Sequence, residues 1–408
     1  MNRLTQLFFL VLFPFLPIWS WVLALIHPTQ IEMFISVVLI PISLFIIISP
    51  NINFPKYLVF FSIFTLYHLY SVYINKLVPP DTTSFKFFLA DREVLACLFF
   101  FVIENTHFDE RFIRIMNRNI FIIVIISLLF SLIQLKNPSF FVSPYILENM
   151  GNETFLNENR IFSIYSWLDL NSLGITFPIL IAILLSSFSH KKMASPIIIL
   201  SGMIVSFLTK ARYVMISTII VFSQYFFNSK ISLRKKVSIL LIFFGSIMIS
   251  LSVAKAMGYN IQEVINDRIL EKSTNMGSAN TRILSYYVFL KVFPEHPLFG
   301  VGPETRPEVV RLLGGRAPII HVGYLSYLYY YGLFGCFFLF LAIFFMLKRA
   351  WTIGSKNDFW GGFYGLLAFC AANLTMVYFN FSEMGIVLII IYLRFFKETS
   401  SLELTTSN

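Results

Sequence analysis

Residues 319–346 read IIHVGYLSYLYYYGLFGCFFLFLAIFFM, and this stretch decides which solvent surrounds the protein. It contains no Asp, Glu, Lys or Arg. An α-helix needs about 20 apolar residues to cross the hydrocarbon core of a bilayer. The stretch therefore predicts a membrane-spanning helix that is long enough to be tilted or bent.

The composition of the whole chain agrees with a membrane environment. Of the 408 residues, 57% are hydrophobic and 13% are charged, whereas soluble domains carry about 25% charged residues. A soluble fold of this size could not hide 48 phenylalanines in its core. The net charge of +10 does not indicate a nucleic-acid partner, because the basic residues form short clusters between apolar runs, as topology signals do.

Apolar runs of spanning length recur along the chain and predict an all-α polytopic membrane protein with about 12 transmembrane helices. The fourth run is interrupted by Asp91, Arg92 and Glu93. We expect one integral membrane domain over residues 1–408. The predicted spans are 7–26, 31–49, 57–74, 84–103, 119–135, 169–189, 194–209, 213–228, 237–253, 319–346, 358–377 and 379–394.

The distribution of positive charge predicts that both termini are cytoplasmic. With that orientation, sixteen Lys and Arg residues fall in cytoplasmic segments and seven lie outside, leaving aside the long loop 254–318. This asymmetry follows the positive-inside tendency. It predicts a bacterial inner-membrane protein with periplasmic loops at 136–168 and 254–318. The larger loop is expected to be partly helical, and residues 398–408 to form a flexible cytoplasmic tail.

Two basic residues lie on the side where the positive-inside tendency does not expect them. Lys210 and Arg212 belong to the short outer connection FLTKARYVM. A cation at the outer membrane surface is costly if it enters hydrocarbon. Arg212 either binds a phosphate in the headgroup plane, where a guanidinium can bind in a bidentate manner, or extends toward lipid headgroups.

Three further residues could take part in chemistry at the outer face. Arg282 begins an aromatic helix in the long loop, and Arg160 ends a polar stretch before a span, but either could be an ordinary surface charge. His321 opens the span 319–346 and could act as a general base. The alternative is a polar cap within the surrounding tyrosine belt.

Several standard catalytic signatures are absent from the sequence. There is no phosphate loop, no H-E-x-x-H, no G-x-S-x-G and no Cys/His metal set. An aspartate-rich D-x-D cluster for a metal-bound nucleotide sugar is also missing. We therefore expect no metal and no cofactor, and the absences argue against a soluble-type glycosyltransferase.

The region from about 200 to 346 resembles the shared core of bacterial O-antigen polymerases and O-antigen ligases. Those families have a short hairpin with an Arg, matched by TKAR and Arg212. An Arg-aromatic helix then ends in a Pro-Leu-x-Gly-x-Gly turn, matched by NTRILSYYVFLKVFPEHPLFGVG with Arg282. The loop closes on a His before an aromatic span, matched by HVGYLSYLYYYGLFG with His321. Many relatives have Asn after this His, where the present chain has Val322.

The resemblance implies a glycan donor carried on undecaprenyl diphosphate in the outer leaflet, with membrane lipid and a chain-length regulator protein as further partners. The diphosphate would be held by arginines and lysine, namely Arg212, Arg282, Arg160 and Lys210. The acceptor hydroxyl would be activated by His321 or by a carboxylate. Candidate outer carboxylates are Glu295, Glu304 and Glu383.

Three functions remain open at the level of the sequence. The first choice is a polymerase that transfers glycan to a lipid-linked repeat unit, because the outer loop is compact and Val322 replaces Asn. The second is a ligase that transfers the finished glycan to a lipid A core. The third is a flippase without chemistry, which the small number of mid-span charges disfavours.

Overall fold

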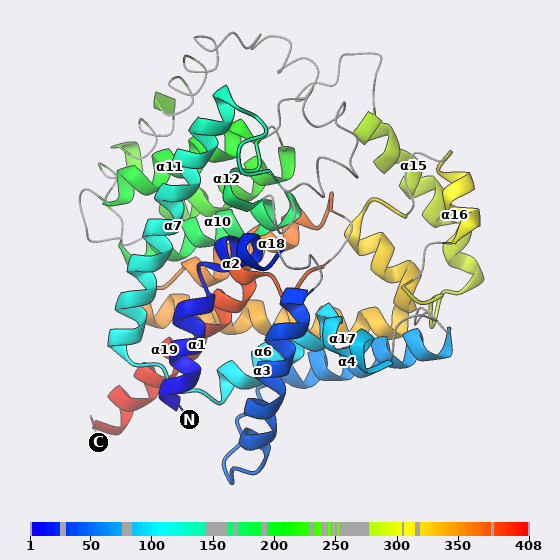
Figure 1. The fold of residues 1–408 in the computed structure, drawn as a ribbon, viewed down its shortest axis with the longest axis horizontal. Helices are drawn as coiled ribbons and strands as arrows, with labels where there is room; N and C mark the ends of the chain where they lie inside the picture. Colours follow the sequence, from blue (N-terminus) through cyan, green and yellow to red (C-terminus); the bar gives the residue numbers. More distant parts are fainter. Residues whose placement is uncertain are drawn as a thin grey trace.

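The computed structural model of the chain is helical throughout the parts that it describes, and its fold is shown in Figure 1. No strand occurs in those parts. The described residues are 2–24, 30–75, 84–142, 161–165, 170–188, 194–209, 211–227, 277–303, 306–314, 319–376 and 379–406, with a few isolated positions between 232 and 252.

Among the described residues, three helices are long and apolar enough to cross a membrane: α4 (Lys56–Ile74), α7 (Glu110–Lys136) and α17 (Gly323–Asn357). Shorter apolar helices accompany them, including α3 (Gln30–Ile47) and α11 (Ala194–Leu208). The architecture is that of a multi-pass membrane protein. The number of spans stays a prediction, since most of the predicted span 237–253 lies outside the described residues.

Four helices form the centre of the molecule: α10 (Leu170–Ser187), α12 (Arg212–Phe227), α18 (Gly361–Ala372) and α19 (Met384–Thr406). Glycines allow these helices to approach closely, as is common between membrane helices. A Cβ added at Gly361 would lie 2.4 Å from the carbonyl oxygen of Ala182. A Cβ added at Gly174 would likewise meet the ring of Tyr213, so α10 and α12 start at the same end of the bundle.

Proline interrupts the first predicted span, 7–26. The chain forms α1 (Asn2–Leu12) and α2 (Leu16–Ala24) instead of one helix. Pro14 falls at the end of α1, where it lacks the backbone N–H that an ongoing helix would use.

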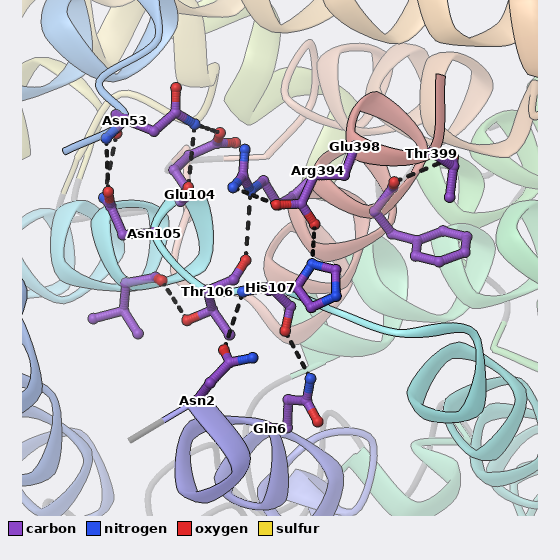
Figure 2. Close-up of polar contacts among 12 residues, drawn as sticks. Asn2, Gln6, Asn53, Glu104, Asn105, Thr106, His107, Arg394, Glu398 and Thr399 are labelled. Carbon is purple, nitrogen blue, oxygen red and sulfur yellow. Dashed lines mark hydrogen bonds and ion pairs between the residues drawn. The ribbon is translucent and has the colours of Figure 1, made fainter. Parts of the chain in front are cut away.

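A polar network joins both ends of the chain at one end of the molecule (Figure 2). The backbone N–H of His107 donates to Asn2 Oδ1 at 3.1 Å, and His107 Nδ1 lies 2.9 Å from Glu398 Oε2. Asn53 Nδ2 donates to Glu104 Oε2 at 2.8 Å. These positions belong to segments that the charge distribution assigns to a single side. Asn2 and Glu398 both contact His107, so the described residues near the two termini lie at the same end of the molecule.

A buried ion pair connects three helices at the same end of the molecule. Glu104 is completely buried and forms an ion pair with Arg349 of α17. Its carboxylate also accepts a hydrogen bond of 2.7 Å from the hydroxyl of Tyr57. The carboxylate thereby links α4, α17 and the end of α6 (Arg92–Glu104).

Two segments outside the spans can be compared with their predictions. The aromatic helix expected in the loop 254–318 is present as α15 (Gly277–Val292), and the short α16 (Pro307–Leu312) follows it. The tail 398–408, predicted to be flexible, begins within α19, which continues to Thr406.

Candidate active site at the end of the helix bundle

The acidic interruption of the fourth predicted span, 84–103, breaks that span into α5 (Ser84–Ala90) and α6. Asp91 is the N-cap residue of α6, and its Oδ1 accepts a hydrogen bond of 2.9 Å from the backbone N–H of Val94. A capping carboxylate satisfies a backbone donor that the helix start leaves unpaired. The break thus has a local cause in the sequence.

His68 of α4 lies between Asp91 and the hydroxyl of Tyr331. Its Nε2 is 2.7 Å from Asp91 Oδ2, and its Nδ1 is 2.9 Å from the Tyr331 oxygen. An ionised carboxylate only accepts hydrogen bonds, so Nε2 donates to Asp91, and in the neutral imidazole Nδ1 accepts from the Tyr331 hydroxyl. The imidazole is 4% exposed and is therefore held in one orientation by partners from two other helices.

Glu93 reaches the same place from the first turn of α6. The Tyr327 hydroxyl lies 2.9 Å from Glu93 Oε1 and 3.0 Å from the carbonyl oxygen of Phe379. One hydroxyl proton cannot satisfy both acceptors fully, so Glu93 keeps hydrogen-bonding capacity. A cavity of about 380 Å³ adjoins these groups. Its lining includes Phe87, Asp91, Glu93, Tyr327, Tyr331 and Asn380.

The turn 297–302 docks on a break in α17. Gly332 has φ 61° inside that helix. The break allows Gly302 N–H to donate to the Tyr330 carbonyl at 2.8 Å, and Leu333 N–H to donate to the Pro297 carbonyl at 2.9 Å. A Cβ added at Gly300, where φ is 70°, would lie 2.3 Å from the Tyr330 carbonyl oxygen. The two glycine motifs of the sequence therefore bind to each other through their backbones.

Arg282 lies on α15, and the backbone of His321 contacts the same helix. Ser285 lies three residues after Arg282, so both side chains share one helix face. The Ser285 Oγ accepts a hydrogen bond of 3.0 Å from the backbone N–H of His321. Arg282 Nε donates to the Thr375 carbonyl, just beyond the end of α18, at 3.3 Å. His321 Nδ1 is 3.1 Å from the Ile319 carbonyl.

A carbonyl oxygen only accepts hydrogen bonds, so Nδ1 of His321 carries a proton. In the neutral imidazole this leaves Nε2 as the nitrogen with the lone pair. The contact with the Ile319 carbonyl therefore favours the neutral tautomer that has its lone pair on Nε2.

Arg212 is the first residue of α12 and lies at the same end of the bundle. Five residues later, Ser217 Oγ donates to the Ala368 carbonyl of α18 at 3.2 Å. Since α12 and α18 run in opposite directions, Arg212 and Thr375 both lie toward one end. Arg160 and Lys210 fall outside the described residues.

The candidate outer carboxylates are placed differently from one another. Glu295 is exposed after α15, and Glu304 lies outside the described residues. Glu383 is 8% exposed and accepts a hydrogen bond of 2.8 Å from Asn380 Nδ2. Glu383 is therefore engaged in holding the loop before α19.

Among the described residues, His68, Asp91 and Glu93 are the group whose atoms could hold a metal ion, with ligand atoms within 4.8 Å of one another. Both nitrogens of His68 already take part in hydrogen bonds. A metal ion bound through this imidazole would have to replace Asp91 or Tyr331 as its partner. The geometry is that of a hydrogen-bonded cluster, and the expected absence of a metal stays a prediction.

Sequence reasoning did not select His68, Asp91 and Glu93 as site residues. A signal for them was present, because a histidine within one apolar run is followed by two carboxylates within the next. Ionisable residues within membrane segments are costly and mark functional sites by default.

The fold and the site define a multi-pass membrane protein in which acidic and imidazole groups from different helices, Asp91 and His68, meet within the helix bundle. Residues 196–341 match the sequence model of a family described as O-Antigen ligase. The chain thus carries a domain of the O-antigen ligase and polymerase family, whose members are membrane enzymes that transfer glycans. A comparison with curated proteins finds no match. The family match confirms the resemblance seen in the sequence and includes Arg212, Arg282 and His321.

Proposed function

We propose that the protein is a polysaccharide polymerase of the inner membrane. It transfers glycan from an undecaprenyl diphosphate carrier to a lipid-linked repeat unit at the periplasmic face. The observation that supports the proposal is the hydrogen bond from the backbone N–H of His321 to Ser285 of α15, the helix that also carries Arg282, within the segment that matches the family.

The two arginines supply the positive charge that the leaving group needs. A diphosphate gains negative charge when the bond to the sugar breaks, and guanidinium groups fixed at that position stabilise it. Arg282 and Arg212 have this role. Two side chains of the matched segment would therefore stabilise the leaving diphosphate.

His321 acts as the general base. Its Nε2 takes the proton of the acceptor hydroxyl while that oxygen forms a bond to the anomeric carbon of the donor glycan. The bond between this carbon and the diphosphate oxygen breaks, and the diphosphate leaves with the electron pair. General-base catalysis of this type contributes about 10²- to 10⁴-fold to a rate.

The polymerase is preferred over the ligase for two reasons. The outer loop predicted at 254–318 is a compact stretch of sequence, and the residue after His321 is Val322, which is 2% exposed and precedes α17. A buried valine offers no side-chain hydrogen bond at this position. The ligase is the second candidate, because the matched family is described as O-Antigen ligase.

The glycan profile of a deletion strain distinguishes the candidates. A polymerase is expected to leave a single repeat unit on the final acceptor when it is deleted. Full-length chains that accumulate on the carrier lipid would identify a ligase. Repeat units retained on the cytoplasmic side would identify a flippase.

The orientation in the membrane can be tested independently of activity. We propose that both termini are cytoplasmic, since sixteen basic residues lie in the segments on their side against seven on the other. A reporter active only in the periplasm is expected to work when fused after position 290 and to fail after position 400. The reverse pattern would invert the topology and place the site on the wrong face.

A further inference from the structure

We propose that the cavity beside Glu93 is a subsite for one sugar residue of the acceptor glycan. This inference rests on the proposed function and adds a binding site from the N-terminal part of the chain. Its polar groups, Glu93, Asp91 and His68, lie outside the segment that matches the family. The cavity therefore combines polar groups from the N-terminal part of the chain with tyrosines of the matched segment, such as Tyr327 and Tyr331.

The chemistry of the lining suits a carbohydrate. Sugar hydroxyls donate hydrogen bonds, and Glu93 retains acceptor capacity because the Tyr327 proton is shared with the Phe379 carbonyl. The apolar face of a sugar ring can pack against aromatic side chains such as Phe87 and Tyr331. Carboxylates combined with aromatic rings provide both kinds of contact in one place.

The size of the cavity points to a single sugar ring. Its volume of about 380 Å³ lies near the lower end of the range for ligand pockets, about 300–1,000 Å³. The cavity opens beside Asp91 and Glu93, whose charges are unfavourable within a membrane segment. Two carboxylates whose oxygens lie within 4.8 Å of each other repel when both are ionised, unless a donor or a proton stabilises them. Hydroxyl groups of a bound sugar would provide such donors.

Residues that line the cavity are close in the chain to His321 and to the hydrogen-bond partner of Arg282. Tyr327 lies four residues after the start of α17, or about 6 Å along the helix axis, and His321 lies directly before that start. The segment that carries Phe379 and Asn380 also follows Thr375, the carbonyl partner of Arg282. Both residues of the proposed site, His321 and Arg282, are thus connected to the cavity through short stretches of chain.

Binding of a carrier-free glycan tests the subsite directly. The probe is the repeat-unit oligosaccharide that mild acid releases from the diphosphate of the organism's own lipid-linked repeat unit. The full-length protein is purified in nanodiscs, and binding is measured by calorimetry. Glu93→Gln and Tyr327→Phe are expected to weaken binding by about 10- to 150-fold, the range for a hydrogen bond to a charged group.

Tyr392→Phe is the matched control. Tyr392 is a buried tyrosine of α19 whose hydroxyl donates to Asn117 Oδ1 at 2.7 Å, away from the cavity. This variant loses a comparable hydrogen bond and should bind the oligosaccharide as the wild type does. Equal weakening in Tyr392→Phe and Tyr327→Phe would mean that general destabilisation, and not a subsite, explains the loss.

Separate readouts distinguish this inference from the proposed function. Normal transfer by the wild type together with unchanged oligosaccharide binding by Glu93→Gln would overturn the subsite and keep the enzyme. No transfer from lipid-linked diphosphate donors by the wild type would overturn the proposed function instead. Thermal stabilisation by Mg²⁺, Mn²⁺ or Zn²⁺ that disappears in Glu93→Gln, without oligosaccharide binding, would identify a cation site and overturn the sugar subsite.

Discussion

Replacement of His321 gives the most direct test of the proposed chemistry. His321→Ala removes the base and is expected to lower the transfer rate by about 100- to 10,000-fold. This corresponds to about 2.7–5.4 kcal/mol in the barrier, at about 1.36 kcal/mol for each factor of ten. His321→Gln keeps hydrogen bonding but cannot take up a proton as a stable cation, so it should be nearly as inactive.

The structure predicts that this loss is catalytic and does not come from unfolding. The tether from His321 to Ser285 uses the backbone N–H, which every variant except proline keeps. The side chain contributes one hydrogen bond to the Ile319 carbonyl, whose loss costs about 0.5–1.5 kcal/mol. Both variants should therefore be produced and inserted normally.

The assay is glycan transfer by purified protein with a lipid-linked repeat unit as substrate. Ser285→Ala is the matched control, because it removes the backbone tether and leaves the imidazole in place. We expect it to lose about tenfold or less, from one hydrogen bond. Substantial turnover by His321→Gln would refute the role as base and leave His321 as a hydrogen-bonding group that positions the substrate.

Three further changes test other parts of the structure. Arg212→Lys and Arg282→Lys should lose long-chain glycan almost as fully as the Ala variants, since an ammonium cannot reproduce the guanidinium fork; long chains from both Ala variants at normal protein levels would assign these residues to lipid headgroups. Glu104→Ala should lower the free energy of unfolding by about 3–5 kcal/mol, because it leaves Arg349 buried without its carboxylate; an unchanged thermal midpoint in detergent would contradict this. Gly300→Ala should expose the turn 297–302 to proteolysis, because its Cβ would lie 2.3 Å from a backbone carbonyl oxygen of α17; wild-type protection would show that the turn can shift at little cost.

Helix positions follow from the sequence where an apolar run is uninterrupted. The predicted spans 57–74 and 119–135 lie within α4 and α7. In the span 84–103 the polar residues interrupt the helix. The carboxylate of Asp91 caps a new helix, α6, at this position. Hydropathy detects the run but does not say where a side chain will cap a new helix.

The family motifs were also readable in the sequence, but their relation to each other was not. The turn 297–302 and the glycine motif around Gly332 are separate stretches of chain. Only the structure shows that the backbone hydrogen bonds left open at the break of α17 are taken by the turn. A missing helical hydrogen bond has no sequence signature until its partner is known.

The sequence by itself determined the membrane environment and the order of the family motifs, and it predicted the approximate spans and the side of the termini, because these depend on local composition and spacing. Tertiary structure decided that His68 meets Asp91 and Tyr331, and that Glu93 faces a cavity. The residues of these pairs come from different helices, up to 263 positions apart in the chain. Which helix faces which neighbour depends on close packing of small residues and on polar groups that need partners in a medium without water.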